Sequence, residues 1–110
     1  MSNIFKNAIY KPTTTVSTTV YSCNATARAI IQNIQLTNQS GNHTVAAYVF
    51  SSSNATTIQI ANTTLSANSM INLAYGPIVL QEGDALLLSA ASTVVAGLVS
   101  IMEINRGLIS

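Results

Sequence analysis

The residue types that could carry out catalysis are scarce in this sequence of 110 residues. It contains one His, His43, one Asp, Asp84, and one Cys, Cys23. A serine hydrolase needs a base and a carboxylate that orients it, and only His43 and Asp84 could supply that pair. Each of them adjoins a different predicted turn; the fold could bring them together, but one such pair among this many Ser residues is weak evidence for a catalytic site. We therefore predict that the chain has no catalytic residues and is not an enzyme.

Metal and cofactor sites are not predicted either. Zinc sites use clusters of Cys and His, whereas Cys23 and His43 each stand alone in the sequence. Glu82 and Asp84 could offer calcium two carboxylates, but we interpret them as a solvated, charged turn that discourages edge-to-edge strand pairing. Cys23 has no Lys or Arg beside it, so we expect a packed thiol rather than a reactive one. We expect no cofactor.

The composition argues against several classes of partner. Charged residues make up 6% of the chain and the formal net charge is +1, whereas roughly a quarter of residues are charged in ordinary soluble proteins. Four scattered Lys and Arg argue against nucleic-acid binding. The most apolar run, residues 94–102, is about half of the roughly 20 residues that a membrane-spanning helix needs. Residues 1–12 lack the apolar core of a signal peptide.

The polar residues of this chain are mostly uncharged. Ser, Thr and Asn together account for 37 of the 110 residues. A surface built from them is nearly neutral, and a net charge near zero favours association. We therefore expect the protein to form a homo-oligomer or to bind other subunits.

The pattern of apolar residues indicates strands throughout and shows no helical period. Short β-rich runs alternate with turn signals roughly every 8–12 residues, which is typical of a β-sandwich. We predict an all-β fold, a single β-sandwich of jelly-roll or Ig-like type with about seven to eight antiparallel strands and an extended N-terminal arm. The expected strands are residues 13–22, 27–38, 43–51, 57–62, 70–75, 78–80, 86–90 and 94–104.

Two of these strands allow more detailed predictions. The pair Ile30-Ile31 breaks the alternation of residues 27–38. A β-bulge near Gln32 and Asn33 would restore it, because it would place Ile31 on the same side as Ile34 and Leu36. In residues 57–62 we expect Ile58 and Ile60 to point inward.

The chain divides into three parts. We assign residues 1–12 to an N-terminal arm, residues 13–104 to the β-sandwich domain and residues 105–110 to a C-terminal tail. The arm carries four large apolar residues, which would form an adhesive patch if they were left exposed, so we expect the arm to dock.

Some apolar residues fall where a solvated outer face is expected. In residues 43–51, two aromatic residues occupy the face opposite Val45, Ala47 and Val49. The last strand is apolar on both faces, with Val95, Val99 and Ile101 on one and Leu98, Met102 and Ile104 on the other. This indicates that a neighbouring subunit covers one face. The candidate assembly interface comprises Ile4, Phe5, Ile9, Tyr10, Tyr48, Phe50, Leu98, Met102 and Ile104.

Five strand motifs follow one another along the chain. They are TTTVSTTVYS at residues 13–22, IQNIQLTN at 31–38, SGNHTVAAYVF at 40–50, GPIVLQEGD at 76–84 and the Val-rich strand at 94–103. Their order resembles that of small β-sandwich virion proteins of tailed bacteriophages, including cyanophages. The first turn departs from the resemblance, because Pro-Ala-Gly is frequent there and this chain has Asn24-Ala25-Thr26.

The resemblance implies a non-enzymatic structural protein of the virion, assembled in the host cytoplasm. It favours a capsid cement or decoration protein, which would form a homotrimer and stabilise joints between major capsid subunits. A neck, tail or baseplate protein is the alternative within the same resemblance. A carbohydrate-binding or receptor-binding β-sandwich is a weaker alternative, because the chain has no Trp. A small hydrolase is the weakest.

Overall fold

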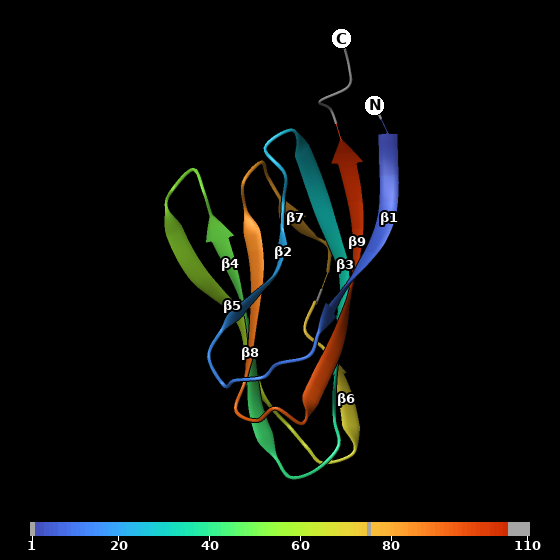
Figure 1. The fold of residues 1–110 in the computed structure, drawn as a ribbon, viewed down its shortest axis with the longest axis vertical. Coiled ribbons are helices and arrows are strands. Elements are labelled where there is room, and N and C mark those ends of the chain that lie inside the picture. Colours follow the sequence, from blue (N-terminus) through green and yellow to red (C-terminus); the bar gives the residue numbers. More distant parts are fainter. Residues whose placement is uncertain (1, 75, 106–110) are drawn as a thin grey trace.

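A computed structural model describes residues 2–74 and 76–105, and its described residues form nine β-strands and no helix (Figure 1). All strand pairs are antiparallel. The predicted C-terminal tail, except for residue 105, and Tyr75 lie outside the described residues. The strands are β1 (Ser2–Tyr10), β2 (Thr18–Ser22), β3 (Ala27–Asn38), β4 (His43–Ser51), β5 (Thr56–Leu65), β6 (Ser69–Asn72), β7 (Ile78–Leu80), β8 (Ala85–Ala90) and β9 (Val95–Asn105).

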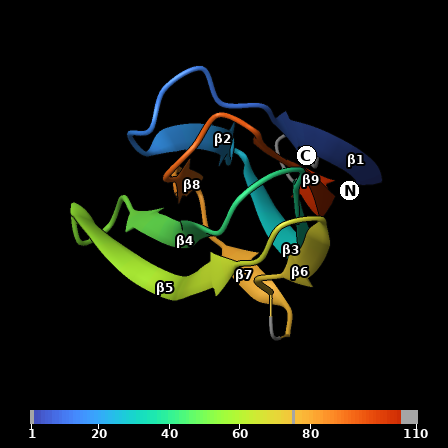
Figure 2. The same ribbon diagram turned by 90° about the horizontal axis from the view of Figure 1, so that it is seen from below.

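The strands form two sheets that pack face to face, so the predicted β-sandwich is confirmed (Figure 2). The first sheet, which we call sheet A, has the order β1-β9-β3-β6, with β7 also paired to β3. Sheet B has the order β2-β8-β4-β5. The core lies between them and is built mainly from β3 and β9 on one side and from β4 and β8 on the other.

Strand β3 shows how a sequence irregularity is accommodated. Ile31, Ile34 and Leu36 are all fully buried, although Ile31 and Ile34 differ by an odd number of positions. The register between β3 and β9 shifts between Ile31 and Asn33. The predicted β-bulge is therefore confirmed, and it turns the apolar side chains on both sides of it toward the core.

The N-terminal segment differs from the expected arm. Residues 2–10 pair along their whole length with β9, from Ser2 opposite Asn105 to Tyr10 opposite Gly97. The segment is therefore the edge strand β1 of sheet A and part of the sandwich. Periodicity did not reveal it because both faces of this strand carry large apolar side chains, so apolar and polar residues do not alternate.

Two further predictions need correction. Only the second half of residues 13–22 forms a strand, β2, and residues 13–16 form a bend. Ile58 lies on the inner side of sheet B, as expected, but it is 54% exposed and does not join the core, whereas Ile60 packs against the core. The reason is geometric, because β5 begins far from sheet A and approaches it only near its end (Figure 2).

A buried amide joins two turns at the end of the sandwich where β3 stops. Asn38 is nearly inaccessible to solvent. Its Nδ2 donates to the carbonyl oxygens of Gly41, Leu65 and Ser66 at 2.5, 3.0 and 3.2 Å. The Asn38 side chain therefore holds the β3–β4 and β5–β6 connections together. An amide group has only two hydrogens for these three acceptors, so one hydrogen is shared.

Candidate assembly surface

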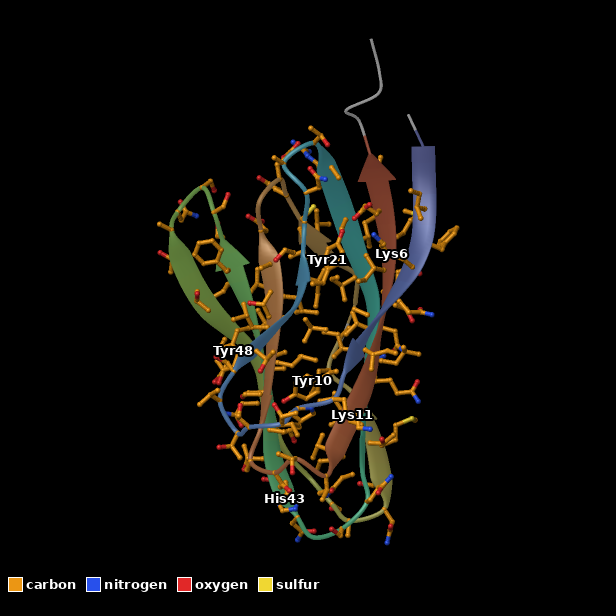
Figure 3. All side chains as sticks on the ribbon, in the orientation of Figure 1. Lys6, Tyr10, Lys11, Tyr21, His43 and Tyr48 are labelled. Carbon is orange, nitrogen blue, oxygen red and sulfur yellow. The ribbon has the colours of Figure 1, made fainter. Side chains whose placement is uncertain are left out.

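The residues considered for catalysis lie at opposite ends of the molecule. His43 begins β4, and Phe50, near the other end of β4, pairs with Ala85, the neighbour of Asp84. Seven residues of strand separate His43 from that end, or about 23 Å at roughly 3.3 Å per residue. Figure 3 shows His43 at the end of β4 where the strand starts. The two residues therefore cannot form a catalytic pair.

Asp84 has a structural role in this fold. Its carboxylate oxygens accept hydrogen bonds from the backbone N–H groups of Ser52 and Gln81, each at 3.0 Å. The side chain is buried, so the expectation of a solvated turn is wrong for Asp84. It holds the β4–β5 turn against the β7–β8 turn. Its neighbour Glu82 forms an ion pair with Arg28, with the Nε and Oε2 atoms 3.3 Å apart.

A partly exposed polar cluster links the two sheets. The Tyr21 hydroxyl of β2 donates a hydrogen bond to Oε2 of Glu103 in β9. Lys6 Nζ of β1 lies 3.6 Å from the same oxygen, and Figure 3 shows Lys6 and Tyr21 toward the same end of the molecule. Burial, followed by the hydrogen bond to Glu103, raises the pKa of the Tyr21 hydroxyl above its ordinary value of 10.0. The cluster joins three strands and both sheets.

This cluster was not predicted, although the sequence of β9 contains one indication of it. Glu103 continues the inward series Val95, Val99 and Ile101 by two residues, so the alternation itself directs a carboxylate into the core. A buried carboxylate needs polar partners. The sequence did not show which residues these would be, because Tyr21 lies 82 positions away.

Cys23 is buried and has no features of a nucleophile. Its Sγ donates to the carbonyl oxygen of Ala27 at 3.1 Å. Burial, followed by the negative charge of Glu103, raises the pKa of the thiol above 9.0. The thiol is therefore protonated at neutral pH, where the reactive form would be the thiolate.

Within residues 2–74 and 76–105, no group of three or more His, Cys, Asp or Glu is arranged so that it could hold a metal ion. The same part of the chain contains no helix of the length and hydropathy that crossing a membrane would require.

The outer face of sheet A carries an apolar row that crosses four strands. Phe5 of β1 lies opposite Met102 of β9, which lies opposite Ile30 of β3, which in turn lies opposite Val79 of β7. Side chains on directly opposed positions of neighbouring strands contact one another. Phe5 is 73% exposed and Val79 is 60% exposed. These four residues form the part of the surface that we call the apolar row.

A second, shorter set of apolar side chains lies beside this row. Ile9 of β1 is opposite Leu98 of β9, and these side chains are 76% and 38% exposed. A fully exposed Phe side chain presents roughly 150–250 Å² and a Val, Leu or Ile side chain roughly 60–120 Å², so Phe5, Ile9, Val79 and Leu98 together expose roughly 200–400 Å² of apolar surface. The polar pair Asn7 and Ser100 lies between the two sets, so they are neighbouring patches, and apolar patches of a few hundred Å² are often functional.

The structure separates the predicted interface residues into groups. Phe5, Ile9, Leu98, Met102 and Ile104 share the outer face of sheet A, as the strand pairing and alternation require. Ile30 and Val79 belong to the same surface and were not predicted. They could not be assigned to it without knowing that β7 and β9 flank β3.

The other four predicted residues lie elsewhere. Ile4 is on the opposite side of β1 from Phe5, and Tyr48 and Phe50 are half-buried on the outer side of sheet B. The Tyr48 hydroxyl accepts a 3.4 Å hydrogen bond from Ser89. Tyr10 is buried in the core, and its hydroxyl has no hydrogen-bond partner among the described residues. The assignment of Tyr10 to a surface is therefore wrong.

Comparisons with known proteins identify the fold. No protein-family model matches the sequence, and a search of curated proteins finds no match. The core of Drosophila NLP, described in terms of pentamer formation and histone binding, superimposes with a TM-score of 0.61 at 14% identity and covers 93% of this chain and 99% of its own.

Two structures of infectious bursal disease virus share the fold as well. A chain of its T13 particle matches with a TM-score of 0.56 at 9% identity over 96% of this chain. A chain of the Gx strain matches with a TM-score of 0.54 at 13% identity over 99%. Each match spans 31% of the viral chain, so this protein corresponds to about a third of its length. At these identities the similarity defines a shared β-sandwich.

Proposed function

We propose that this chain is a non-enzymatic structural protein of a virion and, more narrowly, a capsid cement or decoration protein of a tailed bacteriophage. The observation that carries the proposal is the apolar row Phe5, Met102, Ile30 and Val79 on the outer face of sheet A. An exposed apolar surface of this size on a chain with few charges marks a protein–protein contact. The β-sandwich fold and the order of the strand motifs support a virion component.

The size of the surface suggests how it would work. Burial of the apolar row together with Ile9 and Leu98, roughly 200–400 Å², contributes roughly 5–10 kcal/mol at about 25 cal/mol per Å². Association costs roughly 4–15 kcal/mol in lost freedom, so one copy would bind a capsid subunit weakly. A homotrimer would bring three such surfaces to one joint, and linked contacts bind far more tightly than single ones. The energetics therefore favour a multimer, and the resemblance supports three-fold order.

The test is co-sedimentation with empty shells assembled from the major capsid protein of the same virus. Phe5→Ser removes the most exposed member of the apolar row, and we expect it to weaken shell binding at least tenfold. Val16→Ser is the matched control, because Val16 is 66% exposed but lies outside both sheets. Equal binding by the two variants would show that the outer face of sheet A does not contact the capsid.

A further inference from the structure

Strand β5 is a long sheet edge without the usual protection. It pairs with β4 and, among the described residues, with no other strand. Its ten residues, TTIQIANTTL, include neither a charged residue nor Pro, which are the residues that commonly prevent edge strands from pairing with other chains. The other edges are different, because β1 contains Lys6 and β2, β6 and β7 have at most five residues each. The backbone groups along β5 are therefore available to another strand.

An apolar opening lies beside the first half of β5. Ile58 is on the inner side of sheet B, opposite Val49, yet it is 54% exposed. A hollow of about 260 Å³ lies close by, between β5 and the β6–β7 segment. Figure 2 shows that sheet A does not reach the start of β5. The residues lining the hollow are Ile60, Leu73, Gly76, Pro77 and Ile78.

We propose that β5 pairs with β5 of a second copy, antiparallel and around a two-fold axis at Ile58. In this register Ile58 lies opposite Ile58 of the other copy, Thr57 lies opposite Gln59, and Thr56 lies opposite Ile60. Opposed apolar side chains stabilise an antiparallel pair, and no charged residue faces another. The same segment can serve on both sides, as a two-fold interface requires. Sheet B then continues from one copy into the next.

The bulge in β5 limits the length of this contact. The register between β4 and β5 shifts between Ala47 and Tyr48, so Ile60 is the unpaired residue of β5. A bulge increases the local twist, so a new strand can follow residues 56–60 but not the second half of β5. Five residues on each side form a small interface, and small interfaces dissociate readily. This contact is independent of the apolar row, and it would link copies that a larger surface already holds close together.

The test uses opposite charges at Ile58 in the full-length chain. We expect the weight-average mass of the wild-type protein, measured by sedimentation equilibrium, to at least double between micromolar and millimolar concentration. Ile58→Lys and Ile58→Glu should each abolish this increase, because like charges would face each other across the two-fold axis. An equimolar mixture of the two variants should restore it, which a loss of folding could not do.

Two control variants accompany the charge variants of Ile58. Thr64→Lys adds the same charge at an exposed position in the second half of β5, which the new strand does not follow, so it should associate like the wild type. Phe5→Ser should also retain the increase in mass, which separates this contact from the proposed capsid surface. A wild-type mass that does not change with concentration would overturn the proposal. Continued association of Ile58→Lys, or a mixture that stays as small as its components, would do the same.

Discussion

The buried amide of Asn38 provides a quantitative test of the fold. Asn38→Asp replaces a group that donates to three carbonyl oxygens with one that can only accept when ionised. Two donated hydrogen bonds are lost at about 1 kcal/mol each, and a buried acceptor left without a partner costs about 1–3 kcal/mol more. We expect the free energy of unfolding to fall by about 3–5 kcal/mol. For a domain of this size that corresponds to roughly 13–22 °C in Tm.

Urea and thermal unfolding followed by circular dichroism would measure this change. Asn54→Asp is the matched control, because the Asn54 amide donates to Ser51 Oγ at the exposed β4–β5 turn. Its effect should stay within about 0.5 kcal/mol.

The pH dependence adds a second readout for Asn38→Asp. The introduced carboxyl faces carbonyl oxygens, so its pKa in the folded state must exceed its unfolded value of about 3.9. The variant is then least impaired below pH 4, where the protonated group can donate, and it loses stability as the pH rises through the folded pKa. Equal unfolding midpoints for Asn38→Asp and Asn54→Asp at pH 7 would refute this account of the two turns.

Two further predictions concern the core. Gly97→Ala should reduce the free energy of unfolding by about 1–3 kcal/mol in urea titrations, because an added Cβ would lie 2.8 Å from the Gln35 carbonyl oxygen and would overlap the Leu36 side chain. An unchanged midpoint would mean that β3 and β9 separate easily there. The raised pKa values of Cys23 and Tyr21 mean that the folded chain holds these protons more tightly than the unfolded chain. Stability should therefore be full below about pH 9 and decline as the pH rises further, and a urea midpoint that is equal at pH 8 and pH 10.5 would contradict this.

Local patterns were sufficient to predict much of the fold. The doubled Ile30-Ile31 pair revealed the bulge in β3, and the alternation of β9 separated Val99 and Ile101 from Leu98 and Met102. Both signals arise because a strand points successive side chains to opposite faces. The edge strand β1 was not predicted, because its outer side chains include large apolar residues as well. Apolar and polar residues therefore do not alternate along it.

Contacts between distant segments could not be predicted in the same way. Whether Asp84 is solvated depends on Ser52, which lies 32 positions away and approaches it only after β4 and β8 have paired. The candidate surface shows the same limit. Its residues on β1 and β9 were predicted, whereas Ile30 and Val79 join them only through the strand order of sheet A.

The position of β9 at the centre of sheet A also determines when this chain can fold during synthesis. Strands β1 and β3 each pair with β9 and are not neighbours of each other. The ribosome makes β9 after the other described strands, so most of sheet A cannot form until β9 has emerged. Until then, the apolar strands β1 and β3 remain unpaired with β9, and unpaired apolar strands tend to aggregate. This topology is expected to fold slowly, because most of its contacts join segments that are distant in the sequence. The nascent chain is also expected to need protection against aggregation.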